Sequence, residues 1–197
     1  DLKLLELHPI GVIHKTFIVC ENEDGMYLVD QHAAHERINY EKVLDAMKDK
    51  KIMRTSMLIP ITIELSASEF IDIKQNFEFI RNLGFDIDEF GINTIVIKEH
   101  PTWLNQGYEE ETIRKMIDII LLDKKKFNPV EFNDRLAASM ACKMSIRANM
   151  DISHDVQVEL LKELVQCRNP YNCAHGRPTI IKFSNYDLDK MFKRIMN

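Results

Sequence analysis

The chain has 197 residues, of which 45% are hydrophobic and 29% are charged, a balance typical of a globular protein with one large domain or two small ones. No apolar run approaches the ~20 residues that cross a bilayer, and the first residues lack the features of a signal peptide, so we expect no membrane association. The net charge of −5 argues against a dedicated DNA-binding domain, and the four scattered cysteines argue against a disulfide scaffold and for a reducing cytoplasm. Because the first residue is Asp rather than Met, we expect a piece of a longer protein.

The first predicted elements are a strand over 8–20 and a returning strand over 26–30. The turn between them contains the step Asp24-Gly25, which favours a β-hairpin. A helix is predicted from about 31 to 48, where neither Gly nor Pro occurs. The charged stretch 48–51 marks a boundary.

A second group of elements follows this boundary. The segment 58–65 is a predicted strand in which Pro60 requires an edge or a strand start. Ser66 and Glu69 have the spacing of a capping box, and the helix that they begin is expected to reach Gly84. The remaining predicted elements of this group are strands over 85–90 and 94–98 and a helix over 109–122.

The last part of the chain begins after the charged segment 123–129. It contains a predicted long helix carrying Phe132 and Cys142, a helix from Ser153, a strand over 178–183 and a final helix over 186–196. We therefore predict an α+β fold. Residues 1–55 and 131–197 form one discontinuous subdomain of sheet and helices, which encloses a smaller α+β insertion over 56–130.

Metal-capable side chains gather where the hairpin meets its helix. Asp30 ends the predicted strand, and His32 and Glu36 are spaced by four residues, so they project from one face of the helix. They are candidate ligands of one ion. Taken alone, the pair also fits a capping His and a surface carboxylate.

A second set of candidate ligands lies near the C-terminus. Cys173 and His175 are two residues apart in a turn, and Cys142 lies on a predicted helix. Thiolate and imidazole favour zinc, whereas carboxylates suit Mg²⁺ or Mn²⁺. Taken alone, a cysteine such as Cys142 is most often a small buried apolar residue. These ligands have to converge from distant parts of the sequence.

Four stretches in order carry a family resemblance. Asp30-Gln31-His32-Ala33 followed by Glu36 and Glu41 resembles the endonuclease motif of the MutL family of DNA mismatch-repair proteins. The other three are similar to the family's further motifs: Ala141-Cys142-Lys143, Cys173-Ala174-His175-Gly176-Arg177-Pro178 and Phe192-Lys193-Arg194. Ala174 departs from the usual Pro or Asn, but both ligands beside it remain.

The resemblance implies the C-terminal endonuclease and dimerisation domain of a bacterial MutL protein. The discontinuous subdomain would then mediate dimerisation and cutting, and the insertion would be regulatory. The implied partners are a second copy of the chain, double-stranded DNA, a sliding clamp and the mismatch-recognition protein MutS. The implied location is the cytoplasm, with association to the nucleoid during repair. The implied ions are Zn²⁺ in a structural or regulatory role and Mn²⁺ or Mg²⁺ in catalysis.

The resemblance also implies roles for individual residues. Asp30, His32 and Glu36 would hold the catalytic ion, and Cys142, Cys173 and His175 would complete the metal site. Residues expected to support these ligands or contact phosphate are Gln31, Glu41, Lys143, Arg177 and Arg194. Glu41 is turned about 140° from Glu36 around a helix, so it is predicted to point away from the ion as a salt-bridge partner or a ligand of another group.

Clamp binding is expected from the apolar residues Met57, Leu58, Ile59 and Pro60, although Thr55 stands where the family's peptide has Gln. An alternative to the endonuclease is a non-catalytic module that dimerises, is stabilised by zinc and docks on the clamp. The intact endonuclease motif favours the enzyme.

Overall fold

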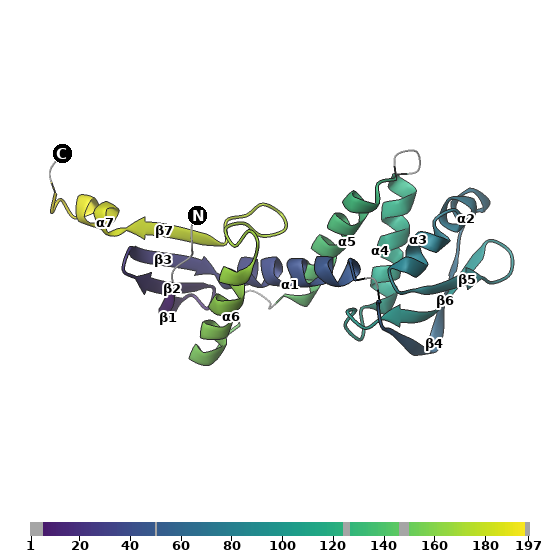
Figure 1. Ribbon diagram of the computed structural model, residues 1–197, viewed down its shortest axis with the longest axis horizontal. Coiled ribbons are helices and arrows are strands. Elements are labelled where there is room, and N and C mark those ends of the chain that lie inside the picture. Colours follow the sequence, from purple (N-terminus) through teal and green to yellow (C-terminus); the bar gives the residue numbers. More distant parts are fainter. Residues whose placement is uncertain (1–5, 50, 124–126, 146–149, 196–197) are drawn as a thin grey trace. The chain divides into compact units, whose positions relative to one another are not determined.

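The computed structural model describes residues 6–49, 51–123, 127–145 and 150–195 (Figure 1). Helices and two antiparallel sheets confirm the predicted α+β class. The chain divides into two compact units, one comprising Asp1–Glu41 and Ala141–Asn197 and the other Lys42–Met140. The division into dimerisation and regulatory subdomains at 55/56 and 130/131 stays a prediction.

The first unit is built on a four-stranded sheet in the order β1-β2-β3-β7. Its strands are β1 (His8–Ile13), β2 (Phe17–Asn22), β3 (Gly25–Asp30) and β7 (Ile180–Ser184). The hairpin of β2 and β3 is confirmed. The prediction of one strand over 8–20 was wrong, because the backbone reverses at His14 and Lys15, whose φ angles are 50° and 53°. Residues other than glycine rarely adopt this left-handed backbone conformation, so the residue types at this turn do not predict it.

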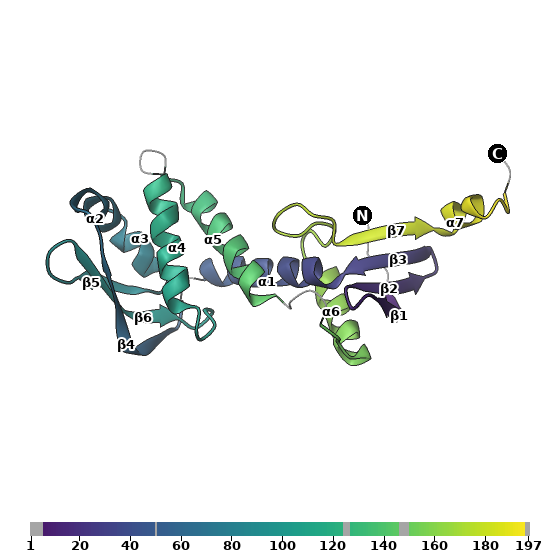
Figure 2. The same ribbon diagram turned by 180° about the vertical axis from the view of Figure 1, so that it is seen from behind.

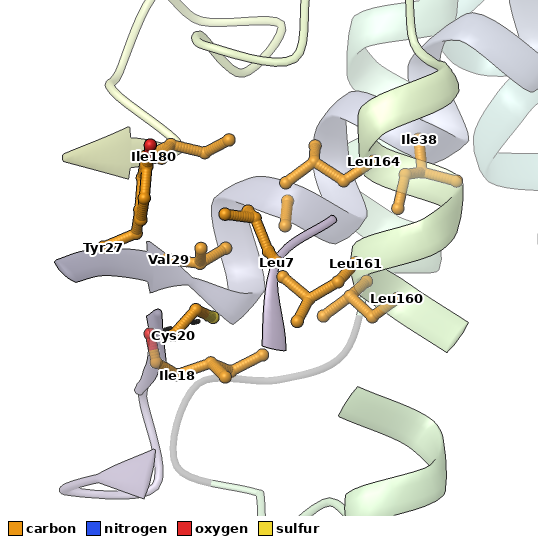
Figure 3. Close-up of a cluster of buried hydrophobic side chains, with 11 residues drawn as sticks. Leu7, Ile18, Cys20, Tyr27, Val29, Ile38, Leu160, Leu161, Leu164 and Ile180 are labelled. Carbon is orange, nitrogen blue, oxygen red and sulfur yellow. Dashed lines mark hydrogen bonds between the residues drawn. The ribbon is translucent and has the colours of Figure 1, made fainter. Parts of the chain in front are cut away.

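Two helices complete the core of this unit (Figure 3). They are α1 (Gln31–Met47), which continues directly from β3, and α6 (His154–Gln166), which begins at the predicted Ser153 cap. Leu160, Leu161 and Leu164 of α6 pack towards the sheet with Ile18 and Val29. This packing fixes the end of β3, and with it the start of α1, where the candidate ligands lie.

The last helix of this unit, α7 (Asn185–Met191), is shorter than predicted. The left-handed conformation of Lys193 (φ 54°) ends it, and the Arg194 N–H donates to the Asp189 carbonyl at 2.8 Å, as in a Schellman motif. Because β7 runs from beside Val29 to beside Gly25, α7 lies at the end of the sheet remote from α1 (Figure 1).

The second unit has a three-stranded sheet in which β6 (Thr94–Pro101) lies between β4 (Arg54–Glu64) and β5 (Asp86–Glu89), as Figure 2 shows. Its helices are α2 (Ala67–Lys74), α3 (Phe77–Asn82), α4 (Glu109–Leu122) and most of α5 (Pro129–Met144). Pro60 lies in an edge strand and Ser66 forms the capping box with Glu69, as predicted.

The single helix expected up to Gly84 was wrong. It is divided into α2 and α3 at Asn76, whose side-chain amide donates to the Asp72 carbonyl at 2.9 Å. A side chain that bonds the backbone in this way competes with helix continuation. Among the described residues, no helix is long and apolar enough to cross a bilayer.

Candidate metal centre

The first turns of α1 are unusual because they bury polar side chains. Gln31, Glu36, Arg37 and Glu41 are each less than a tenth exposed. Buried polar groups are costly unless their hydrogen-bonding atoms find partners, so each of these side chains calls for an identified partner.

Asp30 and Gln31 fix the start of α1. Oδ1 of Asp30 accepts hydrogen bonds from the backbone N–H groups of His32 and Ala33 at 2.9 and 3.0 Å, as a helix cap does. The side-chain amide of Gln31 donates to the carbonyls of Lys15 and Met150 at 2.7 and 3.0 Å. Gln31 therefore ties the β1–β2 turn and the segment before α6 to the start of the helix.

Glu36 is the centre of a cluster of potential ligands. It is 2% exposed. One carboxylate oxygen lies 3.5 Å from Nε2 of His32, and the other lies 3.5 Å from Nδ1 of His175. Ligand atoms of Glu36, Cys173 and His175 all lie within 4.8 Å of one another, so the structure brings the helix and the distant loop together.

The environment keeps Glu36 ionised. Burial by itself raises the pKa of this carboxyl, but the Cys173 and Cys142 thiols and the His175 and His32 rings outweigh burial and hold the pKa below its ordinary value. A carboxylate that stays deprotonated is available as a metal ligand, since only the charged form coordinates well.

Cys142 approaches the same carboxylate from α5. Partial burial and the nearby Glu36 carboxylate raise the pKa of the Cys142 thiol, against the opposing charges of Lys143 and Arg177. The loop residue Arg177 and the helix residue Lys143 thus bring positive charge to the edge of the cluster, and both are exposed.

The donor atoms fit a divalent cation. Oε2 of Glu36 is buried, yet it accepts no well-formed hydrogen bond from any residue that the structure describes. A buried carboxylate oxygen in that position is costly unless a cation neutralises it. Carboxylate oxygen, thiolate sulfur and imidazole nitrogen together are the ligands of zinc.

Two predicted site residues have partners elsewhere. Glu41 is not in the group of ligand atoms around Glu36, and it accepts hydrogen bonds from the backbone N–H groups of Arg168 and Asn169 at 2.8 and 3.3 Å. Arg194 lies beyond α7 and pairs with Asp189 at 3.8 Å, at the far end of the sheet from the cluster. Arg37 was not among the site residues predicted from the sequence. Its positive charge four residues before the negative charge of Glu41 could have indicated a pair on one face of the helix.

Comparison with known proteins decides the family. A family model described as the MutL C terminal dimerisation domain matches residues 10–152. The chain belongs to this family. The matched part of this MutL C-terminal domain includes the candidate ligands Asp30, His32, Glu36 and Cys142 and ends before Cys173 and His175.

Full-length relatives agree with this assignment. The MutL domain is 45% identical over 190 residues to DNA mismatch repair protein MutL of Shouchella clausii, which is 96% of this chain and 29% of the relative. It is 40% identical over 191 residues to the protein of that name from Ligilactobacillus salivarius, 97% of this chain and 29% of the relative. For Halalkalibacterium halodurans the identity is 39% over 190 residues, 96% of this chain and 30% of the relative. The domain thus spans just under a third of these relatives.

Proposed function

We propose that this chain is the metal-dependent endonuclease and dimerisation domain of a MutL mismatch-repair protein, and that it nicks double-stranded DNA by hydrolysing a phosphodiester bond. The observation that carries the proposal is the convergence of Glu36, Cys173 and His175 within 4.8 Å around a buried carboxylate. A carboxylate buried beside a thiol and an imidazole is costly unless a cation neutralises it.

The donors divide by chemistry. Cys142, Cys173 and His175 would hold Zn²⁺ together with Glu36, because thiolate and imidazole prefer it. Asp30 and His32, again with Glu36, offer oxygen and nitrogen donors to a harder ion such as Mn²⁺ or Mg²⁺. When bound, a divalent cation would supply polarisation of the phosphate and a lowered pKa of the attacking water.

Basic side chains of the chain itself would contact the DNA. Arg177 and Lys143 stand at the edge of the cluster, and their charges act on Cys142. We assign them to the phosphate of the scissile strand, which arginine binds through paired hydrogen bonds. The net charge of −5 leaves little general attraction for DNA, so binding by this chain alone is weak.

The test is nicking of supercoiled plasmid by the wild-type chain with Mn²⁺, Mg²⁺ or EDTA, each with and without trace Zn²⁺. We expect nicking that requires the divalent ion and stops with EDTA. The amount of relaxed circular plasmid is measured over time. Protein purified in chelator gives the background level of nicking. Nicking that persists in EDTA would refute a metal-dependent reaction.

The rival function is a non-catalytic dimerisation module with a structural zinc. It is favoured by the two thiols beside Glu36, since closed sites with Cys and His ligands are often structural. On this reading Zn²⁺ raises the melting temperature, but no ion supports nicking by the wild-type chain, even with the clamp present.

Dimerisation would use the outer face of the four-stranded sheet, which we define as Ile13, Phe17, Val19, Leu28 and Ile181. Val19, Leu28 and Ile181 lie opposite one another across β2, β3 and β7. Ile13, Phe17 and Ile181 are 44%, 39% and 51% exposed. A sheet face left to water normally carries polar residues, so an apolar outer face favours an interface. We propose that a second copy covers it through a two-fold symmetric contact.

Clamp binding would use the edge strand β4. The register with β6 breaks between Ser56 and Ile61, which places four residues outside the regular ladder. Two of these, Leu58 and Ile59, are 102% and 82% exposed. Exposed apolar side chains on an irregular edge are suited to a groove of a partner protein. We therefore propose Met57–Pro60 as the clamp-binding segment.

Ile59→Glu is expected to weaken clamp binding by about 10- to 100-fold, because burying an isoleucine contributes about 1.5–3 kcal/mol. The measurement is a titration of immobilised clamp. Ile92→Glu is the matched control, since Ile92 is 90% exposed in the same unit and outside the segment. Equal losses in the two variants would remove Met57–Pro60 as the docking site.

A further inference from the structure

Two oppositely charged side chains of α1 are buried beside the candidate metal centre without belonging to it. Arg37 and Glu41 are 8% and 9% exposed. Nη1 of Arg37 lies 3.5 Å from Oε1 of Glu41, four residues along the helix. A buried ion pair is weak evidence for stability, because desolvation offsets most of the attraction. The further contacts of this pair therefore matter more than the pair itself.

Arg37 holds the loop that carries two of the candidate ligands. Its Nε donates to the Asn172 carbonyl, and its Nη2 donates to the Cys173 carbonyl at 3.1 Å. The forked guanidinium thus grips two consecutive peptide units, a geometry that a lysine cannot reproduce. One of these units belongs to Cys173, whose thiol is a candidate ligand.

Glu41 holds the start of the same loop. Oε2 accepts from the Arg168 backbone N–H at 2.8 Å and from Nε of Arg168 at 3.3 Å. Oε1 accepts from the Asn169 N–H at 3.3 Å. The carboxylate therefore binds backbone donors, while the adjacent arginine binds backbone acceptors further along the loop.

The loop itself is compact beyond these anchors. The Cys173 N–H donates to the Arg177 carbonyl at 2.8 Å, and the Gly176 N–H donates to the Cys173 carbonyl at 3.0 Å. The His175 N–H donates to Sγ of Cys173 at 3.4 Å. Because the turn is braced internally, fixing the Cys173 carbonyl orients the thiol and the imidazole together.

We propose that Arg37 and Glu41 are positioning residues, a clasp that holds the 168–177 loop on α1 so that Cys173 and His175 meet Glu36. The inference rests on the proposed metal centre and adds to it two residues that bind no ion. Glu36, Arg37 and Glu41 lie within two turns of one helix, so the helix sets the position of the loop ligands relative to the helix ligand. Partners that orient ligands in this way typically change metal affinity by about 10- to 100-fold.

The test is titration of the metal-free 197-residue chain with Co²⁺, followed by its thiolate-to-metal absorption and by Zn²⁺ competition. Arg37→Lys and Glu41→Gln are expected to weaken binding by about 10- to 100-fold and to reduce the thiolate absorption at saturation. The control is Ile18→Val, a variant that should lower the melting temperature because Ile18 is fully buried in the core of the same unit. Ile18→Ala replaces it if the clasp variants lower the melting temperature by more than Ile18→Val does. Glu41→Asp keeps the charge on a shorter side chain and serves if Glu41→Gln does not fold.

The outcomes separate the two proposals. Weaker Co²⁺ binding and altered absorption in the clasp variants, with the control unchanged, support the clasp. Wild-type affinity and absorption in the clasp variants overturn it and leave the metal centre standing. A loss that follows melting temperature in all variants, including those of Ile18, also overturns it. A wild-type chain that binds neither ion overturns the metal centre and the clasp together.

Discussion

Replacing Glu36 with lysine is expected to abolish metal-dependent nicking of supercoiled DNA, with a loss of at least about 100-fold. The variant removes a buried carboxylate that lies 3.5 Å from both His32 and His175. It also places a positive charge where a cation would bind. Since altering residues that merely orient ligands already costs about 10- to 100-fold, removing a shared ligand should cost more. The measurement is the initial rate of plasmid relaxation with Mn²⁺.

Two matched variants distinguish loss of nicking caused by removing the Glu36 charge from a general effect of introducing a lysine. Glu36→Gln keeps the shape and removes only the charge, and should lose nicking as well. Glu159→Lys makes the same charge change at an exposed position of α6 and should nick as the wild type does. Zn²⁺ at about 100 times its Kd should stabilise the wild type by about 2.7 kcal/mol, an effect that both Glu36 variants should lack. Nicking at the wild-type rate by Glu36→Lys would mean that the reaction occurs at another site.

Ile181→Glu should convert the dimer into monomers, raising the dissociation constant by about 100-fold or more. Ile181 lies on the outer face of the sheet and is 51% exposed, so glutamate there is tolerated in a single copy. In a two-fold symmetric interface the charge enters twice, and burying an unpaired charge costs about 2–5 kcal/mol. The measurement is sedimentation equilibrium over a range of protein concentrations.

The control for this variant is Ile71→Glu, because Ile71 is 57% exposed on α2 in the other unit. It should leave the dissociation constant unchanged. A dimer that survives Ile181→Glu with wild-type affinity would place the interface on another surface. Loss of the folded state instead of the dimer would appear in circular dichroism, and Phe17→Glu at 39% exposure then serves as a second probe of the outer face.

Local features of the fold were predictable because they depend on neighbouring residues. The β2–β3 hairpin follows from its Asp-Gly turn, and the caps of α2 and α6 follow from Ser66 and Ser153. The breaks were missed where an ordinary residue adopts a rare conformation, as Lys15 does, or where a side chain bonds the backbone, as Asn76 does. The residue types alone require neither the left-handed conformation of Lys15 nor the bond from the Asn76 side chain to the backbone.

The sequence by itself determined the family resemblance and the pairing of His32 with Glu36, because residues four apart share a helix face whatever surrounds them. Only the tertiary structure decided that Cys173 and His175 reach Glu36 and that the apolar outer face of the sheet is left open. It alone assigned Arg37 and Glu41 to the loop backbone. These contacts join segments more than 100 residues apart, and such contacts are set by how strands and helices pack rather than by spacing along the chain.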